Sequence, residues 1–175
     1  MKISKLQKLF IGWIALMLLF LWYATPEVYP LKNDDVTFRM TEQDELFFKN
    51  LRLADYKIAL DSASQYKLYS LKAWPKPSYF PEMKIVQNWL NDEAYLFFEL
   101  EEGMEFVVIH NDTSHLHQLN AEEQYILAQK LYEAIANNDE VELHTTLTTY
   151  TMNKDEKKST KRLLKDYFRL VGKLR

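Results

Sequence analysis

The sequence predicts an α+β protein in which an N-terminal transmembrane helix precedes one small domain. Three observations predict it: an uncharged apolar run near the start, a middle part that alternates apolar and polar residues, and two later stretches with helical spacing. Apolar residues make up 47% of the 175 residues, which is enough to build a core. We expect an antiparallel β-meander packed against two or three helices.

The composition excludes several kinds of site. The chain has no cysteine, so disulfides, thiolate metal sites and cysteine nucleophiles are absent. It has only 3 glycines, whereas loops that cradle phosphates need several of them for close backbone approach. A dinucleotide or nucleoside-triphosphate loop is therefore not expected, and neither is any cofactor.

The apolar run covers residues 9–24 and is predicted to be a transmembrane anchor. Residues 1–8 form a basic start with Lys2, Lys5 and Lys8, and lysines are retained on the cytoplasmic side. Residues 25–35 contain two prolines and read as a stalk, so that residues 36–175 form an extracytoplasmic, periplasmic-side domain. The alternative is a cleaved signal peptide, but Trp22 lies two residues before Ala24, the best cleavage site, where a small residue is preferred.

The domain begins with a possible short strand at 36–40 and a helix at 42–53, which Thr41 caps and in which Leu46, Phe47 and Leu51 recur at helical spacing. The period then changes toward two, which favours strands. The predicted strands cover 56–60, 66–71, 83–90, 94–100 and 105–110, as one meander of three to five strands.

The second half is predicted to contain two helices and one strand. Asn120 and Glu123 form a capping-box pair at the start of the first helix, which ends at residues 137–139. The threonine-rich stretch 141–150 reads as one strand, and the last helix runs over about 156–174. These helices are expected against one face of the sheet.

A loop after the fifth strand holds the one candidate metal site. Imidazoles and a carboxylate that converge from a loop can bind zinc, although the spacing here matches no standard zinc signature and a solvated loop is the simpler interpretation. The weak candidate ligands are His110, Asp112, His115 and His117.

Residues 74–81 form a stiff loop with three prolines and three aromatic residues. Such a composition is typical of interfaces, although the rings could equally plug the end of the sheet. The candidate contact residues are Trp74, Tyr79 and Phe80.

Charge is distributed unevenly along the chain. Residues 154–175 carry nine basic and three acidic residues, whereas residues 32–153 carry ten basic and 21 acidic ones. The last helix is amphipathic, and it could pack on the domain, lie on anionic lipid headgroups or dock with a protein partner. Its candidate interaction residues are Lys161, Arg162, Lys165 and Arg169.

No catalytic motif stands out, because acidic pairs in sequence do not show two carboxylates facing each other across a cleft. We therefore expect a non-enzymatic, membrane-anchored accessory or scaffold protein that contacts a membrane or envelope complex through a protein partner. A small-ligand or metal-binding module that uses the loop 110–117 is the second hypothesis, and a hydrolase with a cryptic site is the third. Nucleic acid is not expected as a partner outside the cytoplasm.

Overall fold

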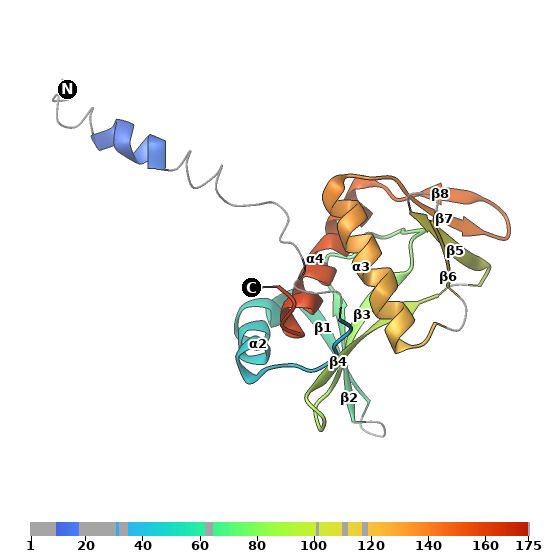
Figure 1. Ribbon diagram of the computed structural model, residues 1–175, viewed down its shortest axis with the longest axis horizontal. Helices are drawn as coiled ribbons and strands as arrows, with labels where there is room; N and C mark the ends of the chain where they lie inside the picture. Colours follow the sequence, from blue (N-terminus) through green and yellow to red (C-terminus); the bar gives the residue numbers. More distant parts are fainter. Residues whose placement is uncertain are drawn as a thin grey trace.

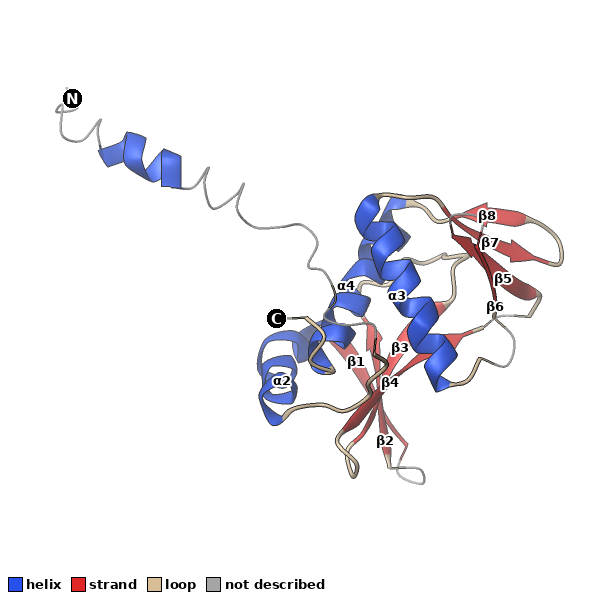
Figure 2. Ribbon diagram, in the orientation of Figure 1, coloured by secondary structure: helices blue, strands red, loops and turns tan. Residues whose placement is uncertain are grey.

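The computed structural model describes residues 10–17, 31, 35–61, 65–100, 102–109, 112–116 and 119–174. The domain combines two four-stranded antiparallel sheets with helices, so the α+β class is confirmed (Figures 1 and 2). Both sheets and the helices contribute to one continuous hydrophobic core.

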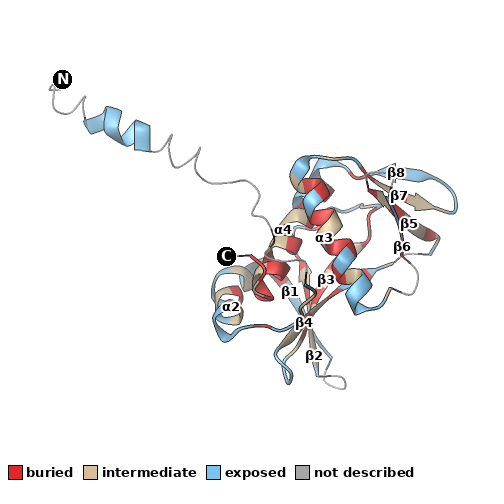
Figure 3. Ribbon diagram, in the orientation of Figure 1, coloured by how far each residue is buried: buried red, intermediate tan, exposed pale blue. Residues whose placement is uncertain are grey.

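The N-terminal segment is described only in part. Residues 10–17 form a helix whose large apolar side chains are exposed (Figure 3). Among the described residues, no helix combines the length and apolar character needed to cross a membrane. The other residues of the predicted anchor 9–24, and most of the predicted stalk 25–35, lie outside the described residues.

The predicted strand at 36–40 is a single bridge instead. Arg39 pairs with Glu93 at the start of β4 (Glu93–Glu99). The Met40 amide donates to the carbonyl of Asp92 at 2.7 Å, and the Ala94 amide donates to the carbonyl of Phe38 at 2.8 Å. The chain thus joins the sheet edge without forming a full strand.

The predicted helix at 42–53 is present but irregular. It consists of α2 (Glu42–Phe47), a π-helical turn η1 (Phe48–Arg52) and a 3₁₀ turn η2 (Leu53–Asp55). A π turn contains one residue more than an α turn and so rotates the side chains that follow it. Contrary to the expected apolar face, Phe48 is buried while Leu46 and Leu51 are exposed.

The first sheet confirms the meander for four strands. Its order is β1-β2-β3-β4, with every neighbouring pair antiparallel. The strands β1 (Tyr56–Asp61), β2 (Tyr66–Leu71), β3 (Glu82–Asn88) and β4 follow the predicted hairpins. Buried and half-buried residues alternate along β3, as expected for a sheet with one face against the core.

The prediction of one sheet is wrong, because the chain starts a second sheet after β4. Its order is β6-β5-β7-β8, with β5 (Met104–Ile109), β6 (Asp112–His115), β7 (Val141–Thr145) and β8 (Thr149–Thr151). The predicted single strand at 141–150 is a hairpin, closed where the Thr145 amide donates to the carbonyl of Thr148 at 2.9 Å. Threonines favour strands and occur on both sides of this turn and within it, so the sequence pattern gave no sign that the strand is interrupted.

Two helices of 17 residues each, α3 (Ala121–Asn137) and α4 (Lys154–Leu170), pack on the first sheet. α3 also contacts β5 and β7 and so joins the two sheets. α4 begins two residues earlier than predicted, because Asn153 caps it through a second capping box with Glu156.

Candidate functional site

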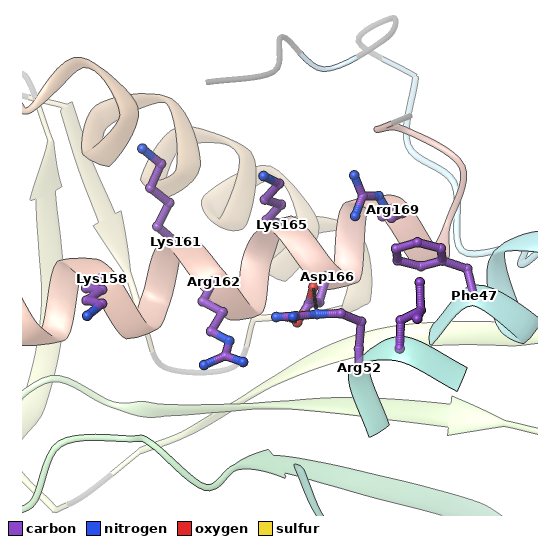
Figure 4. A pocket seen from close by; sticks show the side chains of 9 residues that line it. Phe47, Arg52, Lys158, Lys161, Arg162, Lys165, Asp166 and Arg169 are labelled. Atoms are coloured by element: carbon purple, nitrogen blue, oxygen red, sulfur yellow. Dashed lines mark hydrogen bonds and ion pairs between the residues drawn. The ribbon is translucent and has the colours of Figure 1, made fainter. Parts of the chain in front are cut away.

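A groove runs along α4 where this helix meets α2 and η1 (Figure 4). Its volume is about 480 Å³. Basic side chains dominate its lining, and we call it the basic groove. It is lined by Phe47, Leu51, Arg52, Lys158, Lys161, Arg162, Lys165, Asp166 and Arg169.

The amphipathic character of α4 places these basic residues. One side of the helix is buried in the core, through residues such as Leu163, Leu164, Tyr167 and Phe168. Among the three interpretations of the last helix, the structure therefore shows that it packs on the domain. The side turned away from the core carries the lysines and arginines of the groove.

The buried carboxylate of Asp166 anchors the floor of the groove. Arg52 donates to it with two nitrogens, Nε at 2.8 Å and Nη2 at 2.9 Å, and the Tyr56 hydroxyl donates at 2.9 Å. The hydrogen bonds from Arg52 to Asp166 raise the pKa of Arg52, and burial together with the Asp166 charge raises the pKa of Tyr56. This network ties η1 and β1 to α4, and it leaves Asp166 fully neutralised.

The remaining arginines of the groove are also held in place. Arg162 forms an ion pair with Asp55 of η2. The Arg169 guanidinium lies over the Phe47 ring, 4.7 Å from the ring centroid, in a cation–π contact. Figure 4 shows Lys161, Lys165 and Arg169 rising on one side of α4, while Arg162 points to the other.

The groove retains an excess of positive charge. Lys158 and Lys161 have no carboxylate partner within the described part of the chain. Burial and the neighbouring Arg169 cation lower the pKa of Lys165. A site of this kind stabilises an anion, and a bound carboxylate would relieve the repulsion among its cations.

Four predicted interaction residues come together here: Lys161, Arg162, Lys165 and Arg169 all line the groove. The aromatic loop 74–81 does not contribute to it. Trp74 and Phe80 are buried in the core, so these two rings plug the sheet. Only Tyr79 is exposed, and it stacks on Tyr150 with 4.2 Å between ring centroids.

The loop is instead attached to the start of α4 by the buried Glu156. One carboxylate oxygen of Glu156 accepts from the Ser78 hydroxyl at 2.7 Å and from the Tyr79 amide at 3.1 Å. The other oxygen accepts from the Asn153 amide at 2.9 Å as part of the capping box. The loop therefore supports the helix that carries the groove.

The structure brings together little of the candidate metal site. His110 and His117 lie outside the described residues. Asp112 belongs to β6 and forms an ion pair with Lys130 of α3 at 2.5 Å, while the rings of His115 and Phe106 make a T-shaped contact. Across the described residues, no group of three or more histidines or acidic side chains could hold a metal ion.

Sequence reasoning missed the residues that α2 and η1 contribute to the groove. Phe47 and Leu51 were expected on the apolar face of a regular helix, and Arg52 was not singled out. The π turn carries Leu51 outward and directs Arg52 to Asp166. A single sequence gives no signal for such a turn, which is frequent at functional sites.

No protein family, curated protein or solved structure matches this chain. The geometry of the groove and the properties of the sequence are thus the basis for a functional hypothesis.

Proposed function

We propose that this chain is a membrane-anchored accessory protein without enzymatic activity. In this proposal residues 9–24 span the membrane, the domain 36–175 lies on the extracytoplasmic side, and the basic groove docks on a protein partner of the envelope. The groove carries the proposal: a preformed cleft with six basic side chains and one acidic side chain, already neutralised, is suited to binding.

The anchor is supported by the helix at 10–17. The side chains of Phe10, Trp13 and Leu16 are 69%, 71% and 72% exposed. Large apolar side chains are stabilised when they are removed from water, as in the hydrocarbon of a membrane, while the lysines before them favour the cytoplasmic side. Holding the domain at the membrane surface raises the effective concentration of any membrane-bound partner.

Replacement of Leu16 by arginine tests the anchor. Arginine at the centre of a spanning helix costs about 2.5–3.5 kcal/mol, so L16R is expected to move the chain from the membrane fraction to the soluble fraction. Leu147, in the turn between β7 and β8, is 93% exposed, and L147R serves as the control that stays in the membrane fraction. Equal membrane retention of both variants would contradict the anchor.

Protease added to intact spheroplasts tests the side on which the domain lies. We expect digestion of residues 36–175 without lysis. A domain that stays protected until the spheroplasts are lysed would place it in the cytoplasm and overturn the assignment of compartment.

Photo-cross-linking in intact cells tests the docking surface. A benzophenone amino acid at Leu51, inside the groove, is expected to give one discrete adduct that K161E/K165E abolishes. The same probe at Leu147 is expected to give no such adduct, since this residue lies outside the groove, in the turn between β7 and β8. No adduct at Leu51, or the same adduct at both positions, would refute docking through the groove.

A further inference from the structure

The basic side chains of α4 repeat once per helical turn. Lys158, Lys161, Lys165 and Arg169 are spaced by three or four residues, so they form a row along one side of the helix. Successive members of the row are separated by about 4.5–6 Å along the axis. A partner that pairs with the whole row must present its negative charges with a matching repeat.

The wall opposite this row is apolar. Leu51 is 63% exposed and lines the groove beside Phe47, while Leu46 of the same segment is also exposed. Exposed leucines next to a row of cations favour an occupant that has a negative side and an apolar side. A soluble anion such as inorganic phosphate would leave Leu51 uncovered.

The walls of the groove also restrict the backbone conformation of the occupant. Both walls are formed by helical segments, α4 on one side and α2 with η1 on the other. Helical backbone groups are already paired internally, so an extended peptide would find no sheet edge to join here. A helix satisfies its own backbone hydrogen bonds, and its side chains repeat with the same pitch as those of α4.

We infer that the basic groove binds an acidic amphipathic helix of the protein partner. This inference rests on the proposed function and specifies the partner. Aspartate or glutamate residues one turn apart pair with Lys161, Lys165 and Arg169. Leucine-like side chains on the adjacent side of the partner helix cover Leu51 and Phe47.

A peptide binding experiment tests this inference. The full chain is placed in nanodiscs of neutral phosphatidylcholine, and a fluorescent synthetic peptide of about five helical turns is titrated in. The peptide has glutamates one turn apart on one side and leucines on the adjacent side. A second peptide has the same composition in an order that mixes the two sides.

We expect the first peptide to bind at least about tenfold more tightly than the mixed-order peptide. K161E/K165E and L51D are each expected to weaken its binding by about tenfold or more. K57E/K154E is the control for net charge, because both lysines are exposed and neither lines the groove; it is expected to leave binding unchanged. Equal binding of the two peptides, or equal loss in the control, would overturn the inference.

Acetylation rates of the groove lysines distinguish a peptide ligand from a lipid ligand. The first peptide is expected to slow acetylation of Lys161 and Lys165, whereas nanodiscs with phosphatidylglycerol and no peptide are expected to leave these rates unchanged. Protection by the anionic lipid alone would mean that the groove binds headgroups, and would refute a helical peptide as its ligand. If the Leu51 cross-link forms in cells while the peptides bind alike, the docking proposal stands and only the acidic helix is refuted.

Discussion

α3 and α4 are the same length and begin in the same way, yet they serve different purposes in the domain. Each has 17 residues and an asparagine–glutamate capping box. In α3 the carboxylate of Glu123 accepts, among the described residues, only from the Asn120 amide, at 2.8 Å. In α4 the second oxygen of Glu156 also holds the loop 74–81. The same capping box thus sets where both helices start. Tertiary contacts, which the capping box does not specify, make α4 the helix that holds the loop 74–81.

The largest expected difference concerns the ion pairs of the two helices. D166A removes the buried carboxylate that Arg52 and Tyr56 contact: the Tyr56 hydroxyl loses its acceptor, and Arg52 keeps its ion pair with Asp55 at 3.3 Å but loses both hydrogen bonds to Asp166. We expect it to lower the free energy of unfolding by about 3 kcal/mol or more in urea denaturation. D112A removes the exposed partner of Lys130 on α3 and is expected to leave stability nearly unchanged. Equal effects of the two variants would show that the Asp166 network is not a structural support of the groove.

The two capping boxes are expected to differ by a smaller amount. E156A removes the acceptor of the Tyr79 and Asn153 amides and one of two acceptors of the Ser78 hydroxyl, and should cost about 2–3 kcal/mol of unfolding free energy. E123A removes one exposed capping bond and should cost about 1 kcal/mol or less. Proteolysis within the loop 74–81 gives an independent measurement, since only E156A is expected to accelerate it. Equal cleavage rates would contradict the attachment of this loop by Glu156.

The smallest expected effect comes from removing one buried tyrosine hydroxyl, which should change the free energy of unfolding in opposite directions in the two helices. The buried Tyr125 hydroxyl of α3 has no hydrogen-bond partner within the described residues, and burial raises the pKa of Tyr125 to about 12. Y125F is therefore expected to raise stability by about 1 kcal/mol. In α4 the Tyr167 hydroxyl donates to the carbonyl of Ala94 at 3.4 Å, and Y167F is expected to lower stability by about 0.5–1 kcal/mol. A loss of stability in Y125F would contradict the absence of a partner.

The same tyrosine has a consequence for alkaline stability. Because its pKa is raised in the folded state, Tyr125 keeps its proton at pH values where the unfolded chain loses it, near pH 10. Ionisation of Tyr125 therefore leaves stability unchanged below about pH 10 and lowers it as the pH rises toward about 12. Y125F should reduce the slope of stability against pH in this window by up to about 1.4 kcal/mol per pH unit. Parallel slopes for the two proteins, measured by urea denaturation, would contradict the raised pKa.

Much of the fold follows from local patterns in the sequence. The four strands of the first sheet alternate clearly, and Asn120 with Glu123 marks the start of α3. The division into two sheets could not be predicted, because the turn at 102–103 has the same sequence pattern whether the next strand continues the meander or leaves it. Packing across the whole core determines which strands pair, and a local sequence pattern carries no information about that packing.

Four of the nine residues that line the candidate site could also be predicted. The periodicity of the last helix placed Lys161, Arg162, Lys165 and Arg169 on its polar side, and the structure brings all four to the groove. The opposite wall depends on the π turn at Phe48–Arg52, where one additional residue moves Leu51 out of its expected register. Likewise the loop 74–81 has the composition of an interface, but hydrogen bonds to the buried Glu156 hold it against the start of α4.

The way the chain joins the domain has a mechanical consequence. Residues 38–40 are hydrogen-bonded to the backbone at residues 92–94, so tension on the N-terminal side loads a sheet directly. The hydrogen-bonded strands of the sheet share that force, whereas a surface turn without such bonds would unfold locally. Such a connection suits a domain that must stay folded while tension acts between its N-terminal side and a bound partner.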